Sequence, residues 1–213
     1  MKHYRMILAT LFVALIAFTG LTAQQDKSQS QPKTTEHLKF MGIPIDGSPK
    51  SFANKLKSRG FTLKDPLSPD VIWMTGTFAG ISNSDVFIYK YPATANVYKV
   101  RVVFPGQDSW SQIEMRYNKF KDWLSQKYLL LESTEEFQGY PPSSDSDKMR
   151  KLVLDNCSYL CNYGAGSSKG EFIGSIYLAI RSNSSAYNEG YVAIEYQDYL
   201  NGIKADQSFL DDL

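Results

Sequence analysis

The period of the hydrophobic pattern changes from 3.6 to 2 residues twice along the chain, and this order constrains the fold more than any other feature. Apolar residues at spacings of three and four indicate helices, whereas alternating β-branched and aromatic residues indicate strands. The first helical pattern lies in residues 48–60 and the second begins at Ser109. Three strand patterns follow each helix. The sequence therefore predicts an α+β protein of two αβββ-like units, with antiparallel meander sheets and helices packed on one face.

The first helical pattern belongs to the segment FMGIPIDGSPKSFANKLKSRGF, residues 40–61, which contains a well-defined helix start. Ser48 can cap free N–H groups of the first turn, and Pro49 suits the first helical position because it lacks an N–H and its φ is preset. Phe52 and Leu56 lie four residues apart and so share one face. This face is predicted to be used for packing.

The same segment also raises the question of an active site, because it holds glycines together with Asp46 and Lys55. Gly60 stands where the chain must turn left-handed to end the helix, and Phe61 would then fold back on Leu56 in a Schellman closure. A structural role thus accounts for the conspicuous residues. We interpret the segment as a helix used for packing, and a catalytic role of Asp46 or Lys55 is the alternative.

The remaining elements are predicted from the same two periods. After the first helix, the strand patterns cover Val71–Phe78, Asp85–Tyr91 and Val97–Phe104, with the turn-rich separators AGISNS and PATAN between them. In the second helix, Ser109 and Gln112 have the spacing of a capping box. Its apolar face is expected to contain Ile113, Tyr117, Phe120, Leu124 and Tyr128.

The second set of strands is preceded by a turn-rich connector, FQGYPPSSDSDK, and by a short helical pattern around Asp147–Val153. The strand patterns then cover Asn156–Tyr163, Phe172–Arg181 and Tyr191–Tyr196.

The N-terminus has the pattern of a cleavable signal peptide over residues 1–23. Lys2 and Arg5 precede an apolar run, Met6–Phe18, and Ala23 supplies a small residue for cleavage. The run is shorter than the ~20 residues that a membrane span needs, and no further long apolar run follows. We expect a secreted or periplasmic protein cleaved near Ala23, with no integral membrane segment after cleavage; an uncleaved anchor is the alternative. No cysteine stands at the cleavage point, so a lipid anchor is not indicated.

The predicted domain organisation follows from this cut. Residues 24–37 are polar without apolar periodicity, which predicts a flexible leader. Residues 38–213 are long enough for a single α+β domain, within which 38–105 and 106–200 are candidate sub-units.

Charge argues against nucleic acid and anionic membrane as partners. The chain has 23 basic and 22 acidic residues, and removal of Lys2 and Arg5 leaves 21 basic ones. Affinity for phosphates comes mainly from clustered Lys and Arg, and a near-neutral chain offers little of it. The cluster KLKSR, residues 55–59, is interpreted as the solvated face of the first helix.

The sequence offers few residues for catalysis or metal binding. Its two histidines are His3, inside the signal peptide, and His37, at the end of the leader. A Ser–His–Asp or Cys–His site would depend on His37 alone. GAGSSKG, Gly164–Gly170, lacks the spacing and the ending of a phosphate loop and is interpreted as a hairpin loop. We therefore assign no catalytic, cofactor-binding or metal-binding residue and expect no cofactor.

A pair of carboxylates of the kind that glycosidases use remains an open alternative. Glu195 alternates outward on a predicted strand, and Glu171 lies at the start of another.

Two cysteines, Cys157 and Cys161, occur in the segment DNCSYLCNYG. Export would make a disulfide the default. On one strand, however, their Cα atoms would stand ~13 Å apart at ~3.3 Å per residue, beyond the ~7 Å limit for a disulfide. We predict buried free thiols on one face of the strand, and no disulfide; a bond formed in a helical or bent segment is the alternative.

Several stretches resemble a known group of proteins. KFMGIPIDGSPKSFANKLKSRGF, GTFAG, VRVVFP, GSIYLAI and YVAIEYQDYLN resemble small, uncharacterised secreted proteins of anaerobic Gram-negative gut bacteria. More distantly, the order of a helix and a meander, twice, is similar to the β-lactamase-inhibitor-protein-like fold. That resemblance implies a module that binds other proteins through a sheet face and does no chemistry. It implies topology only, and no functional residue is carried over.

Aromatic content adds one hint of function, since 14% of the residues are aromatic and Tyr is the most frequent type. Tyr and Trp on a sheet face can anchor a protein interface or stack on sugars, although most are expected in the core. Two hypotheses follow. The first is a secreted, non-catalytic protein-binding module of unknown partner, envelope-associated or inhibitory. The alternative is a carbohydrate-binding or glycan-processing protein that uses an aromatic sheet face.

Overall fold

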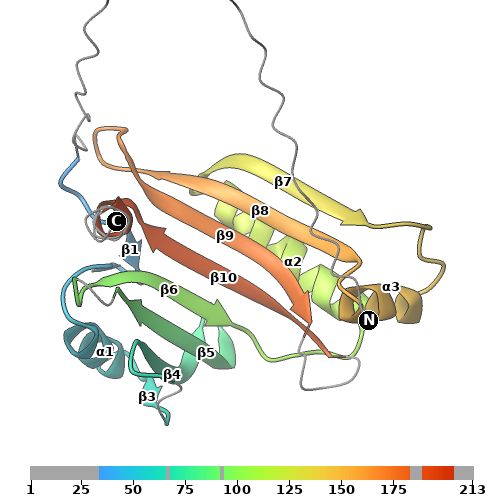
Figure 1. The fold of residues 1–213 in the computed structure, drawn as a ribbon, viewed down its shortest axis with the longest axis horizontal. Coiled ribbons are helices and arrows are strands. Elements are labelled where there is room, and N and C mark those ends of the chain that lie inside the picture. The colour runs from blue at the N-terminus through green and yellow to red at the C-terminus, as the bar shows by residue number, and fades with distance from the viewer. Residues whose placement is uncertain (1–33, 66–67, 92–93, 183–188, 204–213) are drawn as a thin grey trace, which may run out of the picture. The chain divides into compact units, whose positions relative to one another are not determined.

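The structure, a computed structural model, describes residues 34–65, 68–91, 94–182 and 189–203. The predicted signal peptide and residues 24–33 of the predicted leader lie outside the described residues. An eight-stranded antiparallel sheet has the order β3-β4-β5-β6-β10-β9-β8-β7, and β1 and β2 form a separate hairpin (Figure 1). The elements are β1 (Lys39–Phe40), β2 (Ile43–Pro44), α1 (Pro49–Lys57), β3 (Thr62–Leu63), β4 (Val71–Phe78), β5 (Ile81–Lys90), β6 (Val97–Val103), α2 (Trp110–Ser125), β7 (Leu129–Phe137), α3 (Asp145–Val153), β8 (Cys157–Gly166), β9 (Phe172–Ser182) and β10 (Gly190–Asp198).

The predicted α+β class and the two helix-plus-meander units are confirmed. The last strand of the first unit, β6, pairs with the last strand of the second, β10, so the two meanders join in the middle of one sheet (Figure 1). The register places Arg101 opposite Glu195 and Val102 opposite Ile194. A single antiparallel sheet therefore runs through both units.

Helix α1 has the predicted start and end. The Ser48 hydroxyl accepts a hydrogen bond from the Ser51 N–H at 3.3 Å, and Pro49 is the first helical residue. Gly60 has a φ of +88°, and the Phe61 N–H donates to the Leu56 carbonyl at 3.2 Å. The apolar face of α1 is buried as predicted.

The hairpin between β4 and β5 is tighter than predicted. Ala79 and Gly80 have φ values of +51° and +79°, which is the pattern of a two-residue turn that matches the twist of antiparallel strands. Ile81 already pairs with Phe78. The prediction that residues 79–84 separate the strands was therefore wrong. Polar Ser84 can lie within β5 because its hydroxyl donates a hydrogen bond to the nearby Ile81 carbonyl at 2.8 Å.

Strand β7 is an element that sequence analysis did not predict. It is the edge strand beside β8 (Figure 1), and most of its side chains are exposed. The sequence LLLESTEEF has three consecutive leucines and then acids, so it lacks the alternation of a half-buried strand. A register shift at Leu131, between the pairs of Leu130 and Glu132, further disrupts the period.

Helix α2 begins as predicted, but its capping box does not form. The Ser109 side chain makes no capping hydrogen bond. Instead, the carboxylate of Asp145, at the start of α3, accepts from the N–H groups of Trp110 at 3.0 Å and Ser111 at 2.8 Å. A negative charge at a helix N-terminus is favourable and replaces the local cap. Tyr128, predicted on the helical face, lies beyond the end of α2 and packs on the core from there.

The core lies on one face of the sheet, between the strands and the helices. Side chains that alternate along the central strands point into it, namely Val86, Ile88, Val100, Val102, Ile176, Leu178, Ile180, Val192, Ile194 and Tyr196. Aromatic contacts connect the two halves. The ring of Phe104, just after β6, stacks on that of Phe120 of α2 with centroids 4.4 Å apart, and the Phe40 ring of β1 meets the Tyr196 ring edge to face with centroids 5.3 Å apart. The other set of alternating side chains forms the opposite face, which we call the open face.

Candidate binding surface on the open face of the sheet

The open face carries a continuous row of large side chains across five strands. Directly opposed residues run from Trp73 on β4 through Phe87, Arg101 and Glu195 to Tyr177 on β9. All five are only partly buried. The Trp73 and Phe87 rings stack with centroids 5.9 Å apart. Aromatic rings and an Arg on one accessible surface are typical of binding hot spots.

The next row along the strands contains small residues instead, and this produces a hollow. Ala193 of β10 lies opposite Ala179 of β9. On one side of this pair stand Glu195 and Tyr177, and on the other stand Tyr191 and Arg181. Because the two alanines have no atoms beyond Cβ, they form the floor of a hollow of about 400 Å³. The remaining lining residues are Arg101, Leu160 and Gln197.

The central charged pair is tightly organised. The Arg101 guanidinium donates to one Glu195 oxygen from Nε at 2.8 Å and lies 2.6 Å from it through Nη2. The ammonium of Lys99 approaches the other oxygen at 3.7 Å. Burial disfavours the charge on Arg101, but the neighbouring Glu195, with Tyr89 and Tyr191, favours it, and the pKa of the Arg101 guanidinium is raised overall. The carboxylate of Glu195 is thus matched by two cations.

A second hollow, of about 510 Å³, adjoins the first and shares Arg101 and Tyr191 with it. Phe87 and Tyr89 of β5 contribute to its lining. The Lys99 ammonium lies 4.5 Å from the centre of the Tyr89 ring, a cation–π contact. Burial raises the pKa of Tyr89. The open face therefore offers two adjacent hollows bordered by aromatic rings and cations.

Of the residues on this surface, Glu195 could be singled out from the sequence, whereas the others could not. The two-residue period of a strand shows which residues share a face with Arg101, Tyr177 or Tyr191 within the same strand. It cannot show that β6 pairs with β10, or the register that places Ala179 opposite Ala193. The two carboxylates of the glycosidase alternative, Glu195 and Glu171, do not come together. Glu171 lies six residues along the chain from Tyr177, the partner of Glu195, which is about 20 Å along a strand and too far for a glycosidase pair.

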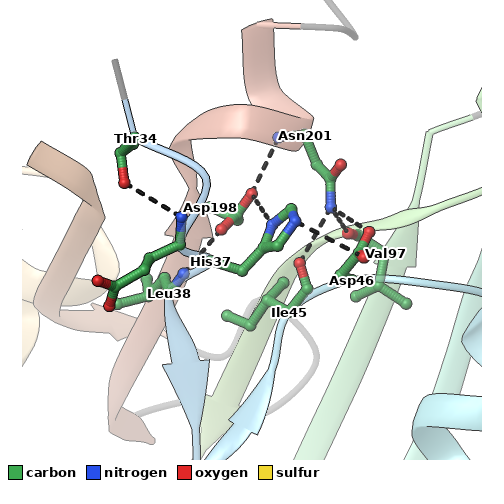
Figure 2. A network of polar contacts seen from close by, with 9 residues as sticks. Thr34, His37, Leu38, Ile45, Asp46, Val97, Asp198 and Asn201 are labelled. Carbon is green, nitrogen blue, oxygen red and sulfur yellow. Dashed lines mark hydrogen bonds and ion pairs between the residues drawn. The ribbon is translucent and has the colours of Figure 1, made fainter. Parts of the chain in front are cut away.

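His37 and Asp46 belong to a different place, a polar network at the end of β10 (Figure 2). The His37 Nδ1 lies 3.0 Å from Asp198 Oδ1, and its Nε2 lies 3.6 Å from Asp46 Oδ2. Asp198 is fully buried and accepts from the N–H groups of Leu38 at 2.8 Å and Asn201 at 2.9 Å. Residues 34–37 of the predicted leader are thus held against the sheet.

The amide of Asn201 completes this network by donating to the carbonyls of Ile45 at 3.0 Å and Val97 at 2.9 Å, and to Asp46 at 3.1 Å (Figure 2). Burial raises the pKa of Asp198 although its hydrogen bonds act in the opposite direction. An aspartate bound to histidine is the orienting half of a catalytic triad. Here Asp198 binds the backbone N–H groups of Leu38 and Asn201, and the Asn201 amide binds the carbonyls of Ile45 and Val97. The network therefore fastens the N-terminal segment to the domain. Lys55, the second residue of the active-site alternative, is exposed on α1, away from this network.

The two cysteines lie where the strand prediction placed them. Cys157 and Cys161 are on β8, both point into the core, and both are buried free thiols. Burial raises the pKa of the Cys157 thiol to about 12. Cys161 Sγ lies 3.0 Å from the Tyr117 hydroxyl. The first three residues of GAGSSKG end β8, and residues 167–170 belong to the turn into β9, where the Ser167 N–H donates to the Glu171 carbonyl at 2.7 Å. The segment therefore lies in a hairpin, as predicted, although the strand extends further into it.

The described part of the chain contains no group of three or more His, Cys, Asp or Glu side chains placed to hold a metal ion. None of its helices has the length and apolar character needed to cross a membrane. Comparison with known protein families, curated proteins and solved structures found no match. The class of the protein is therefore defined by its fold, two helix-plus-meander units in one antiparallel sheet, and by its open face.

Proposed function

We propose that this protein is a secreted, non-catalytic protein-binding module and that the open face of its sheet is the binding surface. The hollow over Ala179 and Ala193 carries this proposal, because it lies on the face opposite the core, among partly buried aromatic and charged side chains and the exposed Arg181. Protein interfaces concentrate their binding energy in such places, where Tyr, Trp and Arg surround a pocket that a partner side chain can fill. The distant resemblance to the β-lactamase-inhibitor-protein-like fold supports the same use of a sheet face.

The test is a comparison of captured proteins between matched variants. Residues 24–213 serve as bait for envelope proteins, in wild-type form, as Tyr191→Ser on the open face, and as Met115→Ser on α2. Met115 is 69% exposed and lies on the opposite layer, so it is the matched control. A protein that binds wild type and Met115→Ser but is lost with Tyr191→Ser supports the proposal. Equal capture by all three forms would place the interface elsewhere.

A glycan is the second candidate ligand, favoured by one observation. Tyr177 and Tyr191 border the same hollow, together with the polar side chains of Gln197 and Glu195. Rings beside hydrogen-bonding groups are suited to stacking on a sugar and binding its hydroxyls. Binding of soluble oligosaccharides to wild type, with loss for Tyr177→Ser and Tyr191→Ser, would favour this candidate over a protein partner.

Secretion is part of the proposal and rests on the N-terminal pattern of residues 1–23. Expression of the full chain in a Gram-negative host should give a product that starts near Gln24 and is recovered from the periplasm or the medium. Recovery of uncleaved chain in the inner membrane would contradict it.

A further inference from the structure

The hollow over Ala179 and Ala193 has more positively than negatively charged side chains in its lining. Its lining contains two guanidinium groups, those of Arg101 and Arg181, and one carboxylate, that of Glu195. Arg101 and Lys99 both approach this carboxylate, at 2.6 Å and 3.7 Å. The negative charge of Glu195 is therefore already compensated, and a positive charge remains on the other side of the alanine floor.

Arg181 carries this remaining charge. It is exposed, at a position opposite Tyr191 and next to Ala179 along the face. Within the part of the chain that the structure describes, Arg181 forms no ion pair. A guanidinium group presents several donors in a planar fork that matches a carboxylate and binds it more specifically than a point charge would.

We infer, on the basis of the proposed protein-binding function, that the hollow over Ala179 and Ala193 receives an Asp or Glu side chain of the partner protein, whose carboxylate binds Arg181. The volume of about 400 Å³ accommodates one side chain. The rings of Tyr177 and Tyr191 border the hollow on its two sides and would cover the aliphatic part of this side chain, and Tyr191, opposite Arg181, would shield the ion pair from water and so strengthen it. Complementary charge would also set the orientation of the partner.

The first experiment uses the two alanine methyl groups as reporters. Protein labelled with ¹³C at alanine methyls is titrated at constant ionic strength with N-acetyl-glutamate amide, N-acetyl-glutamine amide, or inorganic phosphate. The expected result is a saturable shift of the Ala179 and Ala193 methyl signals with the glutamate compound, and none with the neutral glutamine compound. Equal shifts with both, no shift with either, or a larger response to phosphate would overturn the carboxylate assignment.

Variants then test the two parts of the site separately. Arg181→Gln removes the charge, whereas Ala179→Val fills the hollow with a residue that strands favour. Both substitutions should abolish the response of the Ala193 methyl signal. Lys119→Gln, at an exposed position on α2, should preserve this response. A response unchanged in Arg181→Gln would overturn the inference. Circular dichroism and thermal unfolding check that each variant is folded.

Binding of the captured partner to the two variants tests this inference separately from the proposed function. Its affinity should fall at least about tenfold for Arg181→Gln. If Tyr191→Ser releases the partner but Arg181→Gln binds as wild type, the sheet face stands as the interface and the carboxylate inference fails. If both variants bind as wild type, the proposed interface itself is wrong, whatever the methyl titration shows.

Discussion

At the scale of the residue, Gly60 and Gly76 are both glycine, but for different reasons. At Gly60 a Cβ would meet nothing within 4 Å, and the constraint is the φ of +88°. At Gly76 a Cβ would stand 2.6 Å from the Phe61 ring, so the constraint is space. Left-handed backbone disfavours residues with a Cβ, whereas close contact in a core excludes even one methyl group.

This difference gives a prediction for Gly60. Gly60→Val should lower the free energy of unfolding by about 1 kcal/mol or more, because a β-branched residue resists positive φ. Gly60→Asn is the control, since Asn tolerates the left-handed region, and it should cost clearly less. Urea unfolding of the three forms provides the measurement. An unchanged unfolding midpoint for Gly60→Val would show that the end of α1 is misplaced.

The two thiols give a second prediction at this scale. Cys157 and Cys161 are buried, and burial raises the pKa of Cys157 to about 12, so little thiolate forms at neutral pH. Thiol labelling of the folded protein should be slow. Unfolding without reductant should then make two thiols per chain available, counted by mass spectrometry. A denatured, unreduced chain in which Cys157 is joined to Cys161 would contradict the strand β8.

At the scale of the element, the structure shows which boundaries local sequence determines. Strand β4 begins at Val71 and ends at Phe78, as predicted, because its residues alternate with a period of two and turn-forming residues follow it. Strand β7 was not predicted, since an exposed edge strand has no buried face to impose alternation. The sequence predicts Ser109 as the cap of α2, whereas the acceptor is Asp145, which lies 35 residues beyond Trp110 along the chain. Contacts between residues far apart in sequence leave no local pattern.

The cap of α2 can be tested with Asp145→Ala. The Ser111 hydroxyl, with the N–H groups of Ser111 and Trp110, holds the pKa of Asp145 below its usual value. A lowered acid pKa stabilises the fold above the unfolded pKa of ~3.9, and this stability is lost as pH falls through the folded pKa. Loss of a helix N-cap costs about 1 kcal/mol, and this is the cost that we expect for Asp145→Ala at pH 7.

The pH dependence and a local control make this test specific to the cap. The difference between wild type and Asp145→Ala in urea unfolding should shrink below about pH 4. Ser109→Ala should cost much less, because the Ser109 hydroxyl does not cap the helix. A larger loss of stability in Ser109→Ala than in Asp145→Ala would show that Ser109, as predicted from the sequence, caps the helix.

At the scale of the whole molecule, the attachment of the N-terminal segment depends on the buried carboxylate of Asp198. It accepts hydrogen bonds from the Leu38 and Asn201 N–H groups and contacts His37. Asp198→Ala would leave buried donors without an acceptor and should cost about 3 kcal/mol. Hydrogen exchange should show faster exchange of the Leu38 amide. Asp46→Ala is the control, and it should cost less, since the Asp46 side chain is 42% exposed. Unchanged protection of Leu38 in Asp198→Ala would refute this role.

The two units are expected to fold only together, because their shared sheet and core cross the boundary between them. Strand β6 pairs with β10, Phe104 stacks on Phe120, and Phe40 contacts Tyr196. A fragment of residues 38–105 would expose this apolar surface and leave β6 as an unpaired edge, and apolar burial contributes about 25 cal/mol per Å².

The corresponding prediction concerns the folding of fragments. Residues 38–105 and 106–203, made separately, should each give the poorly dispersed amide spectrum of an unfolded or aggregating chain. The intact domain should unfold in one cooperative transition that circular dichroism and Trp fluorescence report together. Mixing the fragments should restore dispersion if the β6–β10 pairing can form between chains. A well-dispersed spectrum of residues 38–105 alone, or two separate transitions in the intact domain, would show instead that each unit is stabilised by its own core.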